Sequence, residues 1–320
     1  MNMVKQFLIQ VYFSFIYYIP HFLRELLLYV GKRRTIILNS FLNYKFGIFH
    51  HCNWGDDINK LFIADGIGSD VILYQNSILS KLKHKENYMC IGSMLHDCNS
   101  QTIVWGSGFL SDDDKFRLKE KPKKVLAVRG KLSRQFLLEQ GVECPEVYGD
   151  PALLLPLFYK KQNIKKRYKL GIVAHIYDEG NPFVQGLKGN NGVIIISLQS
   201  YDNWLHVIDK ICECELILSS SLHGIIVSDA YGIPNAWVEF SDKVVGNGFK
   251  FRDYFSSVSK NVSEPIRITT PIDINNLDRY KKTWEAPTCD LNKLIEASPF
   301  LPLKEKLEDG LLLSINNSSF

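Results

Sequence analysis

Short apolar runs alternate with amphipathic stretches along most of the chain, and this alternation predicts an α/β fold. Apolar, β-branched runs of strand length lie at 35–41, 88–95 and 102–110, each ending in small or polar residues. The segment 123–142 passes from a strand pattern into a helix pattern, and 145–156 adds a short strand and a turn. Strands that alternate with helices in this way predict a parallel sheet.

A second block of the same kind begins near Lys169. Its helix pattern at 202–214 has Asp202 as the expected N-cap, and a further helix is expected from about Leu222. Two such blocks predict two Rossmann-like, doubly wound domains that face a cleft between the carboxyl edges of their sheets, where ligands bind. The strand patterns of the second block lie at 169–175, 192–198, 216–221 and 235–240.

These patterns divide the chain into four parts. Residues 1–34 form an apolar helical segment, and 35–160 and 161–260 form the first and second domains. Residues 261–320 form a tail with weak periodicity, which we expect to pack back on the first domain. The charged stretch 159–167 contains few core residues and is the expected linker between the domains.

The N-terminal segment leaves two interpretations open. Its apolar and aromatic run at 7–19 is shorter than the ~20 residues that a membrane span needs. A cleaved signal peptide would need a basic start and a small-residue cleavage site, and neither is clear. The segment is then a buried helix on the first domain, or an interfacial anchor with Lys32, Arg33 and Arg34 against anionic lipid.

Composition narrows the class of protein. Among 320 residues, 46% are hydrophobic and 22% are charged, as in a globular enzyme. The net charge of +4 comes without a dense basic stripe, which argues against a nucleic-acid partner. The seven cysteines are scattered, and no C-x-x-C pair predicts a metal site. We expect reduced thiols in a cytoplasmic protein.

The stretch SSSLHGIIVSDAYGIP at 219–234 places a histidine where a strand passes into a helix. Free backbone N–H groups at such a helix start bind phosphate or carboxylate, so Ser219, Ser220, Ser221 and Gly224 are candidate anion-binding residues. His223 beside them can act as a general acid or base. The alternative is a histidine that only caps the helix or packs against the neighbouring strand.

Three cations are candidates for the same anion. Arg129 leaves a buried strand, and its planar fork suits a carboxylate or a phosphate, although an ion pair between elements explains it equally well. In GNGFKFRDYF at 246–255, Lys250 and Arg252 alternate with aromatic residues, so they would share one face of an extended segment. The alternative for both is a solvated surface.

Other polar and glycine residues are weaker candidates. The acidic and amide residues of NWGDDIN would bind sugar hydroxyls or simply cap a helix from about Ile58. WGSGF lacks a third glycine, so it indicates close backbone approach rather than a dinucleotide loop. The candidates are Asn53, Asp56, Asp57 and Asn59 for an acceptor, and Gly106, Gly108 and the turn residue Asp150 for the cleft.

Taken in order, these blocks resemble the polysaccharide pyruvyl transferase family. The resemblance covers roughly residues 35–255 and is carried by NWGDDIN, WGSGF, VRGKLSRQFLLEQGV, YGDPALLLP and above all SSSLHGIIVSDAYGIPNAWVEF. It implies a two-domain fold like that of GT-B glycosyltransferases. It also implies that pyruvate passes from phosphoenolpyruvate to two sugar hydroxyls as a ketal while phosphate leaves, with neither metal nor cofactor.

Carried over residue by residue, the resemblance assigns the donor to His223 and Arg129. The chain departs from the family at two positions: Ser221 stands where many members have arginine, and Gly130 where many have aspartate. Lys250 and Arg252 are the cations that we expect to replace the missing arginine. The implied acceptor is a sugar of a surface polysaccharide or of its lipid-linked precursor, at the inner face of the cytoplasmic membrane.

Two other functions remain open from the sequence. A GT-B glycosyltransferase would share the fold and would bind a nucleotide diphosphate at the same helix start. A non-catalytic binding protein of a glycan pathway would bind a ligand without turnover. Inorganic phosphate released from phosphoenolpyruvate distinguishes the first interpretation from both.

Overall fold

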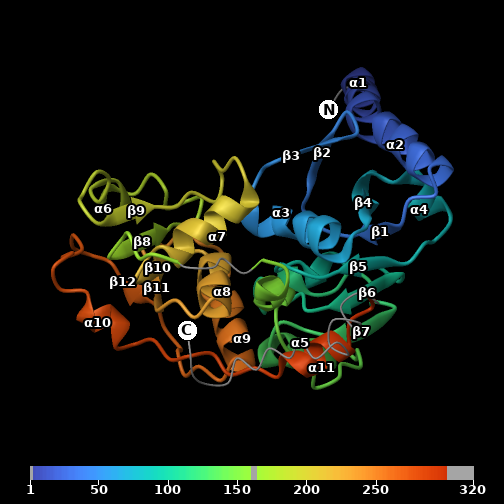
Figure 1. The fold of residues 1–320 in the computed structure, drawn as a ribbon. Coiled ribbons are helices and arrows are strands. Elements are labelled where there is room, and N and C mark those ends of the chain that lie inside the picture. The colour runs from blue at the N-terminus through green and yellow to red at the C-terminus, as the bar shows by residue number, and fades with distance from the viewer. Residues whose placement is uncertain (1–2, 160–163, 301–320) are drawn as a thin grey trace.

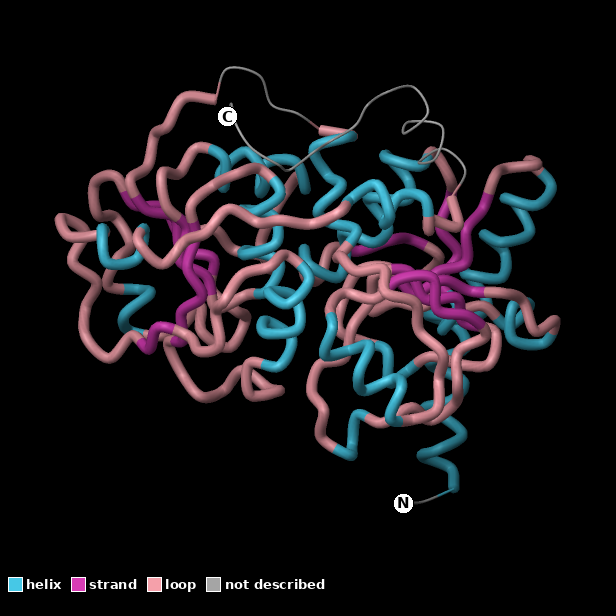
Figure 2. The backbone as a smooth tube through the Cα atoms, turned by 90° about the horizontal axis from the view of Figure 1, so that it is seen from below, coloured by secondary structure: helices cyan, strands magenta, loops and turns pink. Residues whose placement is uncertain are grey.

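The computed structural model describes residues 3–159 and 164–300, and two five-stranded sheets organise them (Figure 1). Figure 2 shows the sheets as two separate groups of strands with helices and loops between and around them. Four of the nine residues of the predicted linker at 159–167, residues 160–163, and the end of the predicted tail, 301–320, lie outside the described residues.

The first sheet is built from β1 (Thr35–Leu38), β4 (Asp70–Leu73), β5 (Asn87–Met89), β6 (Thr102–Trp105) and β7 (Lys124–Ala127). All its strands are parallel, in the order β4-β1-β5-β6-β7. The chain runs from β1 to β4 on one side and then crosses to β5 on the other side of β1. This reversal creates a switch point between β1 and β5. Such a point opens a crevice at the carboxyl ends of the strands.

The second sheet repeats this arrangement with β8 (Leu170–Val173), β9 (Val193–Ile195), β10 (Ile217–Ser219), β11 (Asn235–Glu239) and β12 (Ile266–Arg267). Its order is β12-β11-β10-β8-β9, again all parallel. Its switch point lies between β8 and β10. The predicted α/β class with parallel sheets is confirmed. A strand beyond residue 260 extends the second sheet.

Helices surround both sheets, and an antiparallel hairpin of β2 (Asn43–Lys45) and β3 (Ile48–His50) follows β1. The helices of four or more residues are α1 (Met3–Phe13), α2 (Ile19–Val30), α3 (Trp54–Leu61), α4 (Ile78–Leu82), α5 (Lys131–Glu139), α6 (Pro182–Gln185), α7 (Trp204–Cys212), α8 (Leu222–Ala230), α9 (Phe249–Ser257), α10 (Asp278–Lys281) and α11 (Leu291–Glu296). Shorter or irregular turns are the π-helical η1 (Ser14–Tyr18) and η2 (Phe62–Ile67), and the 3₁₀ turns η3 (Tyr74–Asn76), η4 (Leu95–Asp97), η5 (Asp114–Phe116) and η6 (Pro151–Leu157).

One apolar cluster joins the two halves. It includes Leu38 and Trp54 from the first half and Val173, Leu222 and Trp237 from the second, all nearly or fully buried. Helix α8 packs on β10 and β11 and also on η6, which follows the first sheet. The carboxyl edges of the two sheets are therefore held against each other by shared core packing.

The end of the described chain returns to the first sheet. The indole N–H of Trp105 on β6 donates to the carbonyl of Leu294 on α11 over 2.8 Å. The ring of Phe300 packs edge-on against Trp105 and also against Tyr88. The hydrogen bond to Leu294 satisfies the buried indole nitrogen of Trp105, which would otherwise lack a partner.

Three local predictions need correction. The segment with Lys250 and Arg252 is not extended: it forms α9, where positions two apart point to different sides. Helix α3 begins at Trp54, four residues before the predicted start, with Asn53 as its cap. The cap of α7 is Asn203, whose side chain accepts from the N–H of Leu205, and not Asp202.

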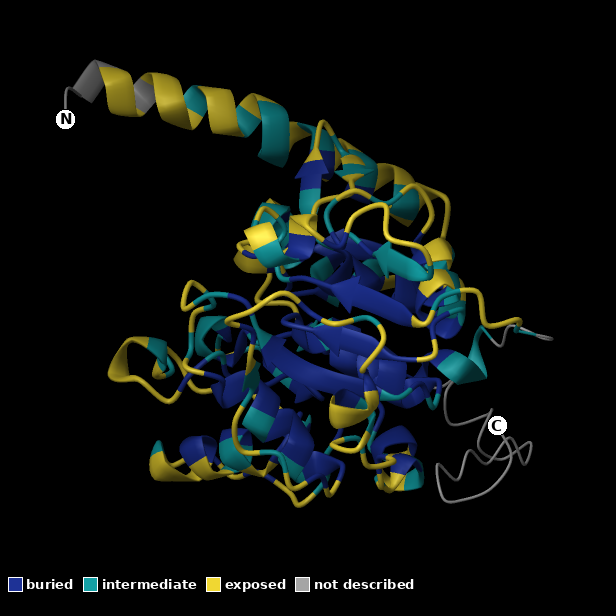
Figure 3. Ribbon diagram, turned by 90° about the vertical axis from the view of Figure 1, so that its left-hand side faces the viewer, coloured by how far each residue is buried: buried dark blue, intermediate teal, exposed yellow. Residues whose placement is uncertain are grey.

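Helices α1 and α2 with η1 form an N-terminal helical arm that projects from the body (Figure 3). Within the described residues, none of the helices combines the length and apolar character needed to cross a membrane. The arm meets the first sheet through α2 and the β2–β3 hairpin.

Candidate active site

A cavity of about 170 Å³ lies where the carboxyl edges of the two sheets meet. Phe41 follows β1, and Gly92 and Ser93 follow β5, so they mark the switch point of the first sheet. His175 follows β8 and His223 follows β10, which flank the switch point of the second. The cavity thus occupies the ligand-binding position of both sheets at once.

His223 lies in the first turn of α8 and lines this cavity. Its Nε2 atom is buried and has no hydrogen-bond partner among the described residues. Burial, and then the positive charges of Lys250 and Arg129, lower its pKa to about 3. The imidazole is therefore neutral at pH 7 and can accept a proton from a bound group.

The start of α3 is pressed against the His223 ring. A Cβ atom at Gly55 would lie 2.3 Å from Nδ1 of His223, so only glycine fits there. The indole N–H of Trp54 donates to the carbonyl of Trp204 over 3.0 Å, which ties α3 to the second half of the chain. Two blocks that carry the family resemblance, NWGDDIN and SSSLHG, thus meet at the histidine.

Lys250 supplies a cation to the same cavity. Its side chain comes from the first turn of α9, and the residue is only 8% exposed. Burial and then Arg129 lower its pKa to about 8, while Asp56 opposes the shift. Ser221, the N-cap residue of α8, makes no side-chain hydrogen bond to the start of that helix. The Lys250 ammonium and the N-terminus of α8 therefore face the same cavity. Arg252 is not among the described residues that line it.

Two of the four acceptor candidates reach the cavity. Asn53 and Asp56 line it, and the Asn53 amide donates to the Asp56 carboxylate over 2.8 Å. Burial raises the pKa of Asp56 to about 6. Asp57 is fully buried and instead accepts from the N–H of Cys52 and the hydroxyl of Tyr201.

Asn59 also faces away from the cavity. Its amide donates to the carbonyl of Ile91 over 2.8 Å and accepts from the N–H of the same residue over 2.9 Å. This pair of bonds fixes the backbone just before Gly92 and Ser93. Asn59 therefore lies behind the cavity wall and holds the backbone segment that lines the cavity.

Arg129 is completely buried behind the cavity wall. Its Nε donates to Asp253 on α9 over 2.9 Å, and its Nη2 donates to the carbonyl of Phe109. Its Nη1 donates to the hydroxyl of Ser93, which does line the cavity. The guanidinium thus reaches the cavity through Ser93 and through its charge, and its own contacts are with protein.

The serine and glycine candidates of the second half shape the loop before α8. The Ser219 hydroxyl donates to the carbonyl of Val173 and accepts from the N–H of Ser221, and the Ser220 hydroxyl accepts from the N–H of His175. A Cβ atom at Gly224 would lie 2.3 Å from Oγ of Ser219. Of these candidates, Ser221 lines the cavity.

Gly106, Gly108 and Asp150 support the site from the first half. Gly106 has a φ of +93° and lies so close to Pro151 that a Cβ atom would be 2.3 Å from its ring. A Cβ atom at Gly108 would lie 2.5 Å from Cζ of Arg129. Asp150 accepts from the N–H of Ala152, and burial raises its pKa to about 7. These three residues are not among the described lining.

The cavity also contains residues that sequence reasoning missed. His175 lines it opposite the α8 start, and burial and then Lys250 lower its pKa to about 4. Ser93 and Phe41 line it as well. All three lie at the ends of strand patterns, 169–175, 88–95 and 35–41, and that position was the available signal.

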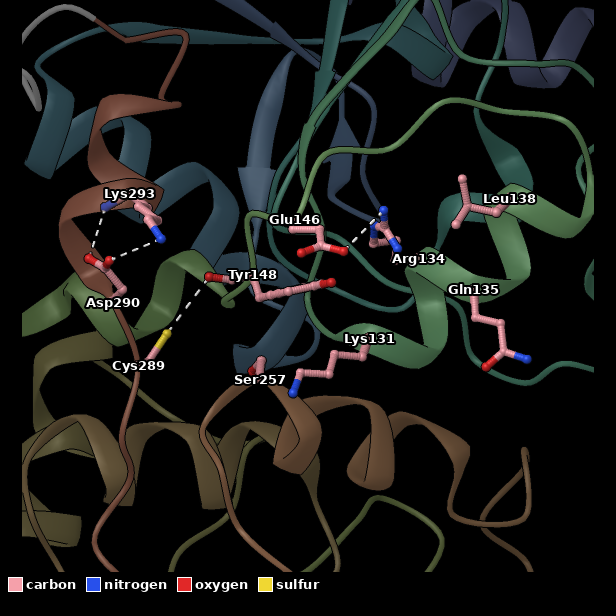
Figure 4. A pocket seen from close by; sticks show the side chains of 10 residues that line it. All are labelled: Lys131, Arg134, Gln135, Leu138, Glu146, Tyr148, Ser257, Cys289, Asp290 and Lys293. Atoms are coloured by element: carbon pink, nitrogen blue, oxygen red, sulfur yellow. Dashed lines mark hydrogen bonds and ion pairs between the residues drawn. The ribbon is translucent and has the colours of Figure 1, made fainter.

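A larger pocket of about 700 Å³ lies between α5 and α11, away from the two switch points (Figure 4). Four of its five charged side chains form two pairs, Arg134 with Glu146 and Lys293 with Asp290, and Lys131 is the fifth. Cys289 contacts the carbonyl of Tyr148. Because most of its charges are neutralised locally and it lies away from both switch points, this pocket is a weaker candidate for an anionic substrate.

Comparison with known proteins bears on the family of the chain. A family model described as polysaccharide pyruvyl transferase matches residues 6–242. The chain is 28% identical over 208 residues to the uncharacterized protein L143 of Acanthamoeba polyphaga mimivirus, a match that covers 64% of this chain and 70% of that protein. It is 27% identical over 215 residues to the succinoglycan biosynthesis protein ExoV of Rhizobium meliloti, over 64% of this chain and 61% of that protein.

Among solved structures, the uncharacterized protein KP1_0663 from Klebsiella pneumoniae matches with a TM-score of 0.39 and 13% identity. The match covers 77% of this chain and 96% of that one.

Proposed function

The chain belongs to the polysaccharide pyruvyl transferase family, and from this premise we propose that it transfers pyruvate from phosphoenolpyruvate to two hydroxyls of a polysaccharide sugar. The product is a pyruvate ketal, and inorganic phosphate is released. The name of the relative ExoV, a succinoglycan biosynthesis protein, supports a polysaccharide acceptor.

One observation carries the proposal: His223 presents an unpartnered, buried Nε2 in a cavity that also holds Lys250 and the start of α8. Phosphoenolpyruvate has a carboxylate and a phosphate, which need a cation and free N–H groups. Its chemistry needs proton transfers beside them. The cavity brings both requirements together.

The proposed reaction balances in protons and bonds. The C3 carbon of phosphoenolpyruvate gains one proton, and C2 is attacked by a sugar hydroxyl, which loses its proton. The bond between C2 and the phosphate oxygen then breaks, and the second hydroxyl attacks C2 and gives up its proton. Two protons leave the hydroxyls, one ends on C3 and one leaves with phosphate.

We assign these steps to residues as follows. His223 moves a proton between a hydroxyl and the donor, and its lowered pKa keeps the imidazole in the neutral form that can accept a proton. Lys250 and the start of α8 bind the donor anions. Asp56, paired with Asn53, orients the sugar. Arg129 positions Ser93 and adds positive potential from behind the wall.

The arrangement of the halves fits the same proposal. We propose a GT-B-like architecture, with the donor side at 161–260 and the acceptor side at 35–160, supported by the shared strand order of the sheets. We also propose a cytoplasmic reaction, supported by seven cysteines that are all free thiols.

The test measures phosphate release from phosphoenolpyruvate with candidate oligosaccharides, together with mass spectrometry of the product. His223→Gln should lower turnover by about 10²–10⁴-fold, because it removes a proton-transferring group. His206→Gln, at an exposed histidine on α7, is the matched control and should retain activity. Near-normal turnover in His223→Gln, or turnover of a nucleotide sugar alone, would exclude the proposed mechanism.

A further inference from the structure

The N-terminal helical arm is attached to the body by its polar side. On α2, His21 is fully buried and Glu25 is 4% exposed, whereas Leu27 and Val30 are 73% and 71% exposed. His21, Glu25 and the half-buried Leu28 lie at i, i+4 and i+7, so they form one helical face toward the body. A surface helix normally buries its apolar face and exposes its polar face.

The side chains of α2 that face the body are polar, and the ring of Tyr44 packs edge-on against His21. Nη1 of Arg24 donates to the carbonyl of Val71 over 2.7 Å, and the Ser77 hydroxyl donates to Glu25 over 2.6 Å. Large apolar residues are exposed along the whole arm, whose ribbon is coloured mainly exposed or intermediate in Figure 3. These residues are Leu8, Ile9, Tyr12, Phe13, Phe15, Ile19, Phe22, Leu23, Leu26, Leu27, Tyr29 and Val30. An apolar surface of this extent marks an interaction site.

The charges on the arm indicate its partner. From residue 5 to residue 34, the exposed charged side chains are Lys5, Lys32, Arg33 and Arg34, all cationic, and the single acidic residue, Glu25, is buried. Of these cations, Arg33 pairs with Asp70 of β4. Apolar and aromatic residues beside cations fit the interface of a bilayer that contains anionic lipid. A second copy of the chain would bring the same cations against these, which is unfavourable.

We propose that the arm lies in the plane of an anionic membrane surface and docks the protein there. A hairpin then connects the membrane with the cavity. The N–H of Phe46 in the β2–β3 turn donates to the carbonyl of Ile16 over 2.7 Å. A Cβ atom at Gly47, whose φ is +73°, would lie 3.0 Å from the carbonyl oxygen of Pro20.

This hairpin starts just after Phe41 and ends just before Asn53, and both of these residues line the cavity. The arm therefore holds the acceptor side of the cavity near the membrane. If the proposed function is right, the acceptor is carried on a membrane lipid. The docking itself does not depend on that function.

The test is flotation of the full-length protein with vesicles of phosphatidylglycerol or of phosphatidylcholine, at low and high salt. The protein should float with phosphatidylglycerol vesicles and less with phosphatidylcholine. The double variant Leu23→Ser/Leu27→Ser should reduce flotation at least about tenfold. Its control is Leu82→Ser/Leu138→Ser, at exposed leucines off the arm. The double variant Lys32→Gln/Arg34→Gln should reduce flotation at low salt and leave flotation at high salt unchanged.

Circular dichroism verifies that each variant is folded. Flotation that is absent, or equal in Leu23→Ser/Leu27→Ser and its control, would overturn the proposal. So would self-association in sedimentation that the same arm variant abolishes, without vesicle binding, because it would show a second copy on the apolar side. Pyruvyl transfer is measured separately, with oligosaccharides and with detergent-solubilised lipid-linked acceptors, so its absence with both would refute the function without affecting the docking.

Discussion

The buried pair of Arg129 and Asp253 should be a main stabilising contact between the strand-end loop of the first sheet and α9. Both side chains are fully buried. Asp253 accepts from Nε and Nη2 of Arg129 over 2.9 Å, and from the N–H and the hydroxyl of Ser133 over 2.7 Å each. We predict that Asp253→Asn destabilises the protein strongly while changing the side-chain volume very little.

The magnitude follows from the burial. In Asp253→Asn, the amide NH₂ replaces one carboxylate oxygen and must face a donor, either Ser133 or Arg129. The guanidinium also loses its compensating charge. Breaking a buried pair by removing one partner costs about 3–5 kcal/mol. For a chain of this size, that corresponds to a fall in Tm of about 5–15 °C.

The assay is urea and thermal unfolding followed by tryptophan fluorescence, at one protein concentration. Glu146→Gln is the matched control, because Glu146 is the 73%-exposed partner of Arg134 and its pair should contribute less than about 1 kcal/mol. The double variant Arg129→Met/Asp253→Leu should be more stable than Asp253→Asn, since it leaves no unpaired buried charge.

An Asp253→Asn protein that unfolds at the same urea concentration as the wild type would refute the reasoning. Arg129 would then be free of Asp253 in solution, and its guanidinium would be available to contact a donor anion directly. A large loss of stability instead assigns Arg129 a positioning role behind Ser93.

Two further predictions test the surroundings of the site. Gly130→Ala should unfold at a clearly lower Tm than the control Gly180→Ala, because a Cβ atom at 130 would lie 1.8 Å from the carbonyl oxygen of Asp253 and one at 180 meets nothing within 4 Å. The folded pKa of Asp56, about 6, exceeds the unfolded value of 3.8, so its contribution to stability falls as pH rises from about 4 to 6. Asp56→Asn should therefore raise Tm at pH 8 and change it little at pH 4. The control Asp113→Asn, at an exposed aspartate, should not show this difference. An equal gain in Tm at both pH values for Asp56→Asn would contradict the raised pKa of Asp56.

The α/β class and most strand positions could be predicted because buried parallel strands leave continuous apolar runs. Helix α9 could not be predicted, because its pattern is ambiguous. Phe249 and Phe251 alternate with cations as in a strand, yet Phe251 and Phe255 are four apart as in a helix. Packing against α5 decides for the helix. Local sequence does not contain that information.

The site was predictable in its position and less so in its side chains. The ordered blocks located His223, and the strand-end position of His175 could have located that residue too. Asp57 and Asn59 show the limit of pattern reasoning. Their partners Tyr201 and Ile91 come from other elements, and only the fold decides which of four neighbouring polar residues faces the cavity.

Helix α9 contributes a charge near each of the two positions where the chain departs from the family pattern. Ser221 lacks the arginine that many members have, and Lys250 on α9 supplies a cation to the cavity that Ser221 lines. Gly130 lacks an aspartate, and Asp253 on the same helix supplies the acid that pairs with Arg129. A side chain at 130 would collide with the backbone of Asp253, so the glycine is what permits α9 to approach. One helix therefore provides both a cation to the cavity and the acid that pairs with Arg129.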